Sequence, residues 1–152
     1  MEVFVDYVVI MCTPYSVRAG LVEKIVDDLS TVTAGREIMR KTVRLSRDDI
    51  AFIYPRMVNT IYFDLISECF TAGDSECIVL SGDGIHDRVN TVKGKIRFVD
   101  GMISANGLRG QYLAGEQRYE FFFHSTDSNN ESDELGARFF GKEFAFADRP
   151  NE

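Results

Sequence analysis

Hydrophobic and polar positions along the chain change repeatedly between the spacing of strands and the spacing of helices. Residues 3–12 (VFVDYVVIMC) are rich in β-formers and almost continuously apolar, which is typical of a central strand. After a TPYS break, apolar side chains recur every four residues from Val17 to Leu29, with Ser16 as a candidate N-cap. The chain is therefore predicted to begin with a buried strand followed by an amphipathic helix.

The remainder of the chain predicts further strands and helices in alternation. The predicted strands cover residues 37–45, 76–82 and 119–123, the predicted helices cover 47–54, 61–70, 85–92 and 131–140, and a long irregular stretch ends at Gly107. This order contains two strand-helix-strand units, which fits the ferredoxin-like split βαβ plan. We predict a single α+β domain over residues 1–152, a four-stranded antiparallel sheet covered by helices on one face.

Composition and charge place the chain among globular proteins. Of its 152 residues, 45% are hydrophobic and 27% are charged. The formal net charge of −7 argues against general nucleic-acid binding, which requires a basic surface. A local basic pocket for phosphates is still compatible with this charge.

The cysteines and the N-terminus indicate the compartment. Cys12, Cys69 and Cys77 are isolated and odd in number, so they build neither a zinc site nor a disulfide framework. The apolar N-terminal segment carries Glu2 and Asp6 without a basic region, and no run reaches membrane-spanning length. We expect a soluble, cytoplasmic protein with reduced thiols and no membrane partner.

A histidine ends the most aromatic segment of the chain, EFFFHSTDS at residues 120–128. Strand alternation would place Phe122 and His124 on one face of the sheet. One interpretation is a histidine that ends a core strand and bonds to a turn hydroxyl. The other is a nucleophile or general base oriented by a carboxylate, because neutral imidazole, with an ordinary pKa of about 6.5, can attack phosphorus.

Longer segments extend the pattern around this histidine. HSTDS at 124–128 precedes ELGARFF at 134–140, GLRGQY forms residues 107–112, and VVIMCTPYSVRAGLVEKIV forms residues 8–26. Together they resemble the nucleoside diphosphate kinase family, whose signatures include a first strand followed by Lys-Pro-Asp-Gly and a helix. The catalytic histidine of that family is followed by Gly-Ser-Asp-Ser and a helix with a supporting glutamate. The resemblance spans roughly residues 4–141.

The resemblance implies roles for individual residues. His124 corresponds to the catalytic histidine, Glu134 to the carboxylate that orients its ring, and Thr126 to a hydroxyl beside it. Arg109 stands where the family has a phosphate-binding arginine, and Tyr54 where it has a pocket tyrosine.

Three positions depart from the family pattern. Thr13 replaces the lysine at the end of the first strand, Thr60 replaces an arginine, and Phe121 replaces an asparagine that contacts the sugar. Phosphoryl transfer depends on positioning and on neutralising charge, and the loss of one preorganised donor typically costs about 10²–10³ in rate. The nucleophile is thus retained while donors around it are lost.

A basic stretch offers a replacement for these donors. Arg88, Lys93, Lys95 and Arg97 follow one another with no acidic residue among them. This stretch is either a solvated strip or a rebuilt phosphate clamp. The second histidine, His86, lies just before it and is predicted to be a solvent-facing residue of a loop or of a helix start.

Two functions from different classes follow. The first is a phosphotransferase that moves a γ-phosphate between nucleotides through a phosphohistidine at His124, with Mg²⁺ arriving with the nucleotide. The second is a catalytically degenerate domain that serves as a nucleotide-binding or assembly module, which the departures from the family pattern favour. In both cases the resemblance implies nucleoside di- and triphosphates as ligands and a homo-oligomer.

Overall fold

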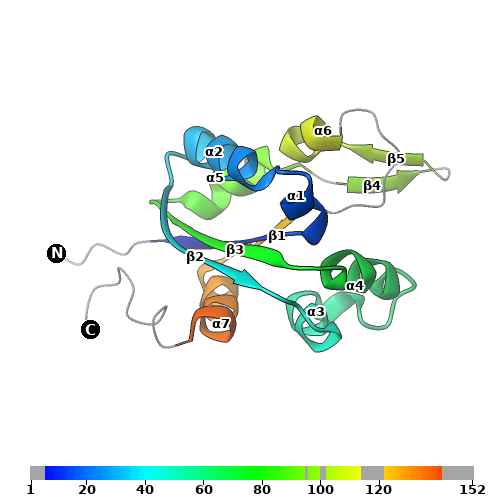
Figure 1. Cartoon of the computed structure of the whole chain (residues 1–152). Helices are drawn as coiled ribbons and strands as arrows, with labels where there is room; N and C mark the ends of the chain where they lie inside the picture. Colours follow the sequence, from blue (N-terminus) through cyan, green and yellow to red (C-terminus); the bar gives the residue numbers. More distant parts are fainter. Residues whose placement is uncertain (1–5, 95, 100–101, 114–121, 142–152) are drawn as a thin grey trace.

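The structure is a computed structural model that describes residues 6–94, 96–99, 102–113 and 122–141, with the backbone alone for residues 96–99 and 102–105. Figure 1 shows one sheet with helices on both of its faces and a two-stranded hairpin set to one side.

The central sheet has four antiparallel strands in the order β2-β3-β1-β6. The strands are β1 (Tyr7–Cys12), β2 (Arg36–Val43), β3 (Ser75–Ser81) and β6 (Phe123–Ser125). β1 lies in the interior of the sheet with all of its residues buried, as its continuous apolar run predicts. The predicted α+β class with a four-stranded antiparallel sheet is confirmed.

Helices connect the strands and follow the predicted order, with a 3₁₀ helix and the helix before β6 added. They are α1 (Pro14–Arg18), α2 (Val22–Thr33), α3 (Arg47–Ile53), the 3₁₀ helix η1 (Pro55–Met57), α4 (Phe63–Thr71), α5 (Ile85–Val92), α6 (Gly107–Leu113) and α7 (Asn129–Phe140). None of the helices in the described part of the chain combines the length and apolar character needed to cross a bilayer.

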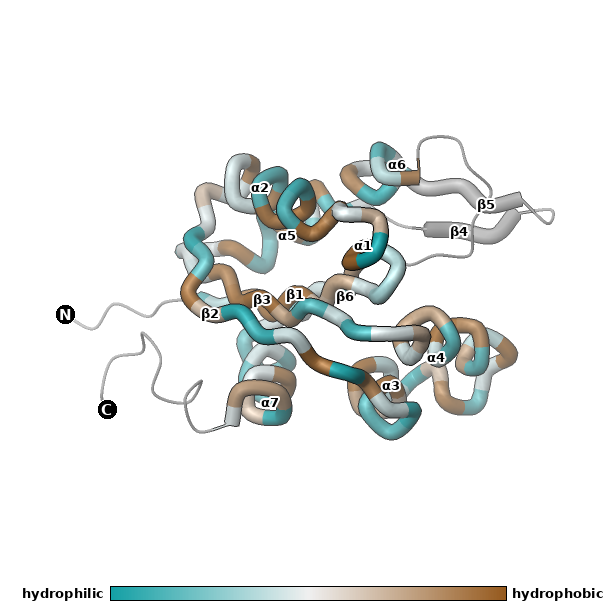
Figure 2. Tube along the Cα trace, viewed as in Figure 1, coloured by the Kyte–Doolittle hydropathy of each residue, from teal (hydrophilic) through white to brown (hydrophobic). Residues whose placement is uncertain are grey.

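Apolar side chains on both faces of β1 create two cores. Val8 and Ile10 pack with α2 and α5, whereas Val9 and Met11 pack with α3, α4 and α7 on the opposite face. The hydrophobic colouring of β1 and β3 in Figure 2 lies between these two groups of helices. The prediction of helices on one face is wrong, because a strand that is apolar on both faces must be covered on both.

The first predicted helix is divided into two. Gly20, with φ +70°, lies between α1 and α2 in a left-handed conformation that favours glycine. Thr13, rather than Ser16, caps α1, and its Oγ1 accepts a hydrogen bond from the Ser16 backbone N–H at 3.3 Å.

A hairpin and a helix occupy the stretch predicted to be irregular. β4 (Ile96–Val99) pairs antiparallel with β5 (Met102–Ala105), and α6 follows. In the sequence, an Asp-Gly pair at 100–101 separates two apolar runs, which is a strong hairpin signal that the prediction missed. The helix after the hairpin carries Arg109.

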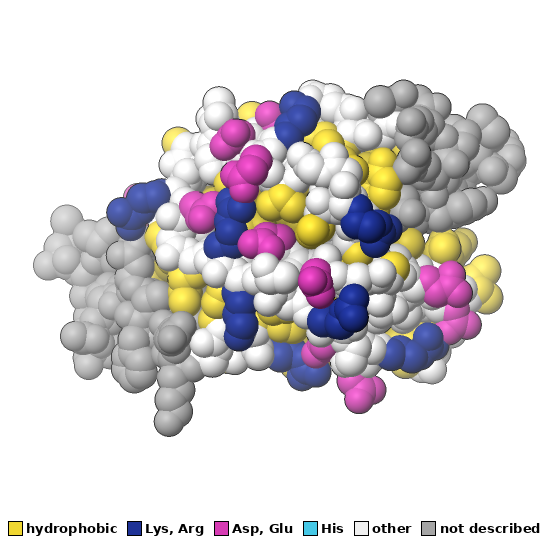
Figure 3. All heavy atoms as spheres, viewed as in Figure 1, with side chains coloured by type: hydrophobic (Ala, Val, Ile, Leu, Met, Phe, Trp, Pro, Cys, Tyr) yellow, Lys and Arg dark blue, Asp and Glu magenta, His cyan; other side chains and the backbone are white. Residues whose placement is uncertain are grey.

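Charged side chains are mixed on the face seen in Figure 3, where acidic and basic groups lie close together over α2 and β2. Arg40 on β2, for example, forms ion pairs with Glu23 of α2 and Glu37 of its own strand.

Candidate active site around His124

Strand β6 places His124 on the sheet face that α3, α4 and α7 cover. His124 pairs with Met11, which belongs to that core, while Phe123 pairs with Cys12 and belongs to the other core. Phe122 precedes the strand and packs in the same core as Phe123, so the predicted common face for Phe122 and His124 is wrong. Regular alternation begins only where pairing with β1 begins.

Two side chains hold the imidazole ring of His124. Its Nε2 lies 3.2 Å from Glu131 Oε1. The Tyr54 ring meets it edge-on, with 4.8 Å between ring centroids and 73° between planes. The His124 side chain is 11% exposed, so the ring is held in a largely closed site that still reaches the surface.

The contact with Glu131 determines which ring nitrogen can react. Although burial opposes ionisation of Glu131, hydrogen bonds from His124 and from the Asp127 backbone N–H hold its pKa below the ordinary value. The carboxylate can only accept, so the His124 proton resides on Nε2 and the lone pair on Nδ1. Among the described residues, Nδ1 has no hydrogen-bond partner. Nδ1 is therefore the candidate nucleophile.

Burial lowers the pKa of His124, and the positive charges of Arg109 and Lys93 act in the same direction, while Glu131 opposes them. The neutral, nucleophilic form is therefore the predominant one at neutral pH.

Glu131, and not Glu134, makes the contact that the sequence assigned to Glu134. Ser128 caps α7 by accepting a hydrogen bond from the Glu131 backbone N–H, which places Glu131 in the first turn beside the end of β6. Glu134 lies almost one turn further along the helix and faces the neighbouring pocket. The carboxylate closest to the strand end therefore reaches the ring.

Thr126 anchors the end of β6 rather than touching the ring. Its Oγ1 accepts a hydrogen bond from the Val9 backbone N–H at 2.9 Å, and its backbone N–H donates to the Val9 carbonyl at 3.1 Å. Within the described part of the chain it makes no bond to His124. Its contribution to the site is to fix where β6 ends.

Two basic side chains lie beside His124. Lys93 Nζ, at the end of α5, contacts Ser125 Oγ at 3.1 Å and Asp127 Oδ1 at 2.9 Å. The Arg109 guanidinium donates to the Phe123 carbonyl at 2.7 Å and lies over the Phe123 ring. Both therefore bring positive charge next to the ring without contacting it directly.

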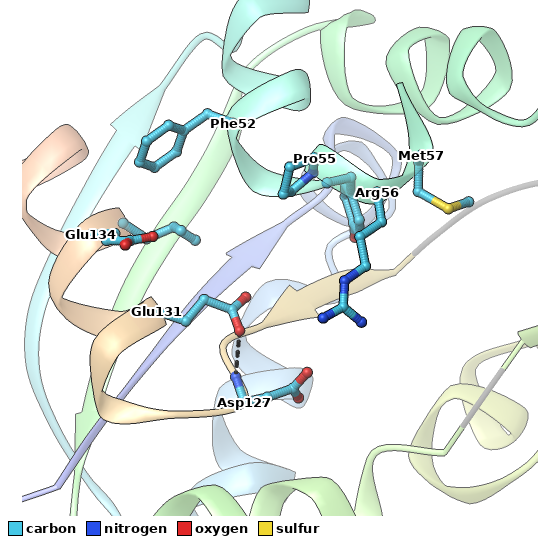
Figure 4. A pocket seen from close by; sticks show the side chains of 9 residues that line it. Phe52, Pro55, Arg56, Met57, Asp127, Glu131 and Glu134 are labelled. Atoms are coloured by element: carbon cyan, nitrogen blue, oxygen red, sulfur yellow. Dashed lines mark hydrogen bonds between the residues drawn. The ribbon is translucent and has the colours of Figure 1, made fainter. Parts of the chain in front are cut away.

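A pocket of about 550 Å³ adjoins the ring between α7 and η1 (Figure 4). Its lining residues are Phe52, Tyr54, Pro55, Arg56, Met57, Asp127, Glu131, Glu134 and Leu135. This volume lies within the usual range of small-ligand sites, about 300–1,000 Å³. Tyr54 and Glu131 contact both the pocket and the His124 ring, so a bound ligand would lie close to that ring.

Comparison with known proteins identifies the family. Residues 6–144 match the family model described as nucleoside diphosphate kinase. The chain belongs to the nucleoside diphosphate kinase family. A search among curated proteins finds no significant match.

Solved nucleoside diphosphate kinases share the fold at low sequence identity. The Aquifex aeolicus enzyme is 20% identical, with a TM-score of 0.68 over 95% of this chain and 96% of that one. The Encephalitozoon cuniculi enzyme is 18% identical, with a TM-score of 0.73 over 100% and 95%. The Halobacterium salinarum enzyme, solved in complex with CDP, is 20% identical, with a TM-score of 0.67 over 94% and 88%.

At two of the positions where this member of the nucleoside diphosphate kinase family departs from the family pattern, the side chain hydrogen-bonds to a backbone carbonyl of the protein. Thr13 is fully buried and its hydroxyl lies 3.3 Å from the Phe122 carbonyl. Thr60 is exposed and donates to the Met57 carbonyl at 2.8 Å. Neither is among the residues that line the pocket. The predictions for Phe121 and for the Lys95 side chain fall outside the described residues.

The predicted basic clamp is divided in the structure. Arg88 donates to the Thr33 carbonyl at 2.9 Å, at the C-terminal end of α2, where a cation is favourable. Lys93 instead reaches the loop after β6. Of this pair, only Lys93 lies beside His124.

The second histidine is buried, so the prediction that His86 faces solvent is wrong. Its Nε2 lies 3.0 Å from Ser132 Oγ, which donates to the Tyr7 carbonyl at 2.6 Å. Thr126 Oγ1 lies 2.6 Å from the same hydroxyl. Ser132 donates its single hydroxyl proton to the Tyr7 carbonyl. The Thr126 hydroxyl and the His86 Nε2–H therefore both donate to the Ser132 oxygen. This network joins β1, α5, α7 and the end of β6.

Both histidines should make the fold sensitive to acid. Burial lowers the folded pKa of His86 and of His124 below the unfolded value of about 6.5. The unfolded state then binds protons first, so stability should be complete above pH of about 6.5 and decline as the pH falls towards the folded pKa values. Urea unfolding at pH 8, 7, 6 and 5 should give a constant free energy at the two higher values and a decreasing one below.

His86→Gln should show a shallower decline than the parent between pH 7 and 5, because one of the two groups no longer titrates. An increase in the parent's stability on acidification over this interval would contradict the prediction.

Proposed function

We propose that the chain is a nucleoside diphosphate kinase-type phosphotransferase that moves a γ-phosphate between nucleotides through a phosphohistidine at His124. The observation that carries the proposal is the His124 ring itself, which is bonded through Nε2 to Glu131 and has its Nδ1 lone pair without a partner among the described residues. In this proposal the protein acts in the cytoplasm, as its isolated cysteines suggest, and forms a homo-oligomer, as the family resemblance implies.

Two half-reactions follow from this arrangement. The Nδ1 lone pair attacks the γ-phosphorus, the N–P bond forms as the bond to the bridging oxygen breaks, and the nucleoside diphosphate leaves with the electron pair. The Nε2 proton stays on the ring, whose positive charge is stabilised by the Glu131 carboxylate. A terminal oxygen of a second nucleoside diphosphate then attacks the phosphohistidine and restores the neutral ring.

Lys93 and Arg109 supply the positive charge that the family lysine supplies elsewhere. Lys93 Nζ contacts Ser125 Oγ and Asp127 Oδ1, and the Arg109 guanidinium donates to the Phe123 carbonyl, so both charges lie close to a phosphoryl group bound to the ring. Lys93 would exchange its contact with Asp127 for one with phosphate.

Magnesium fits the site as part of the nucleotide. The described residues contain no group of three or more His, Cys, Asp and Glu side chains that could hold a metal ion. Mg²⁺ usually takes one or two carboxylates together with phosphate oxygens and water. Asp127 lines the pocket and would hold it there, where Mg²⁺ neutralises phosphate charge.

A second candidate is a nucleotide-binding or assembly module without transfer activity. The observation that favours it concerns Thr13, which stands where the family has a lysine. Its side chain is fully buried and bonds to Ser16, so it cannot reach a phosphate. This candidate retains nucleotide binding in the pocket and predicts no covalent intermediate.

The test is a labelling experiment on the intact protein. Mixed with γ-labelled ATP and Mg²⁺ without an acceptor, the protein should take up label that acid releases and alkali does not, as expected of a phosphoramidate. Addition of an unlabelled nucleoside diphosphate should discharge the label into the corresponding triphosphate. Protein that binds nucleotide but takes up no label would overturn the transferase proposal in favour of the binding module.

A further inference from the structure

We propose that Arg56 is a phosphate-binding residue of this pocket, holding the phosphates that remain on the nucleotide while His124 takes the terminal one. This inference rests on the proposed function, which supplies the nucleotide. Arg56 lies on η1, two residues after Tyr54, and the sequence comparison assigned it no role.

The charges of the pocket create the need for such a residue. Asp127, Glu131 and Glu134 line it, and Glu131 is held in its ionised form. Among the described residues that line the pocket, Arg56 alone has a basic side chain. A nucleoside diphosphate carries several negative charges, and like charges at short range repel, so a cation among these acids favours its binding.

Arg56 is available for that task. Most of the arginines whose contacts are described already bind a carboxylate or a carbonyl. These are Arg40, Arg44, Arg47, Arg88, Arg109 and Arg138. Arg56 is exposed and makes no hydrogen bond or ion pair with any described residue. It would therefore lose no existing bond on binding phosphate.

The direction of the side chain points to where the ligand would lie. In Figure 4 the Arg56 guanidinium extends from η1 across the hollow towards Asp127. No ion pair forms between Arg56 and Asp127, whose carboxylate is instead 2.9 Å from Lys93 Nζ. Arg56 and Lys93 thus approach the same loop from two elements and leave a space between η1 and α7.

The chemistry of the guanidinium suits this space. Its planar set of N–H donors matches two phosphate oxygens at once, and it remains charged at every physiological pH. Pro55 begins η1 and fixes its own φ, so the segment that carries Arg56 is partly preorganised. Arg56 can in this way compensate for Thr60, which bonds to its own turn and does not line the pocket.

The test compares a nucleoside with its mono- and diphosphate on matched variants. Arg56→Met keeps most of the unbranched apolar stem and removes the charged guanidinium. Arg18→Met is the control, because Arg18 is also exposed and also without a hydrogen bond or ion pair to any described residue, but does not line the pocket. Binding of adenosine, AMP and ADP, and of the guanine series, is measured by calorimetry at fixed Mg²⁺ and salt.

Arg56→Met should weaken ADP or GDP binding about 10- to 100-fold, the usual effect of losing a charge-assisted hydrogen bond, and leave nucleoside binding within about twofold. Arg56→Lys should fall between the parent and the methionine variant, because it keeps charge but not the bidentate geometry. Arg18→Met should match the parent.

Three other outcomes would contradict the proposed role of Arg56. Arg56→Met that binds diphosphates as tightly as the parent removes the role of Arg56, even where the parent still forms the phosphohistidine. Equal losses for nucleoside and diphosphate mean that Arg56 shapes the pocket and does not read phosphate. A parent protein that binds no nucleotide overturns both this inference and the proposed function.

Discussion

His124→Ala should take up no phosphate from γ-labelled ATP, and Glu131→Gln should take it up about 10²- to 10³-fold more slowly than the parent. The first change removes the nitrogen that would form the covalent bond. The second changes the state of the ring, because the Glu131 carboxylate is the group bonded to Nε2, at 3.2 Å. Rapid-quench measurement of a single half-reaction reports the effect directly.

The physical reason lies in what each side chain can donate. A carboxylate only accepts, so it holds the ring proton on Nε2 and leaves Nδ1 free to attack. A glutamine amide can donate to Nε2 instead, which moves the ring proton to Nδ1 and removes the nucleophilic lone pair. The same substitution removes the negative charge that stabilises the cationic ring formed during transfer.

Glu134→Gln is the matched control for Glu131→Gln. It is the same chemical change on the same helix, at a residue that lines the same pocket and makes no bond to the ring within the described residues. Its phosphorylation rate should stay within about threefold of the parent, the effect expected of a screened charge near the site. A larger loss for Glu134→Gln than for Glu131→Gln would restore the role that the sequence assigned to Glu134.

The sheet could be predicted from the sequence because its strands carry strong local patterns. Residues 7–12 are apolar at every position except Tyr7, and that run predicts an interior strand wherever it occurs. The same run also implied that both faces of the sheet are covered, which the prediction of one helical layer overlooked. The hairpin over residues 96–105 was missed because its Asp-Gly signal was treated as part of a loop.

The site was only partly predictable because it is assembled from distant segments. Periodicity could not place Tyr54 of the α3–η1 junction against His124 of β6, and only the family resemblance suggested their proximity. The resemblance also assigned the wrong carboxylate to the ring, because this chain has one residue fewer than the family between HSTDS and ELGARFF. A local signal was available, since Ser128 and Glu131 form the S-x-x-E spacing of a capped helix start.

Arg56 was missed for a related reason. The comparison with the family sought an arginine six residues after Tyr54 and found Thr60 there. An arginine two residues after the tyrosine lies on a 3₁₀ turn, whose geometry no spacing rule for helices or strands describes. That η1 lines the pocket depends on tertiary structure, which the local sequence pattern does not reveal.

Ser132→Ala should destabilise the fold by about 2–4 kcal/mol, because the Ser132 hydroxyl is the centre of a buried network. It is fully buried and lies 2.6 Å from the Tyr7 carbonyl, 2.6 Å from Thr126 Oγ1 and 3.0 Å from His86 Nε2. Removal leaves the carbonyl without this donor, and the Thr126 hydroxyl and the imidazole without this acceptor. Urea unfolding at pH 7.5 measures the change.

Ser67→Ala provides the control, because Ser67 is also buried but its hydroxyl has no hydrogen-bond partner in the described part of the chain. Removing an unsatisfied hydroxyl should be neutral or stabilising by up to about 1 kcal/mol. The contrast between two buried serines isolates the hydrogen bonds from the loss of one oxygen atom. Equal free-energy changes for Ser132→Ala and Ser67→Ala would show that the network contributes nothing. The expected difference would mean instead that the Ser132 network helps to fix the end of β6, the strand on which His124 stands.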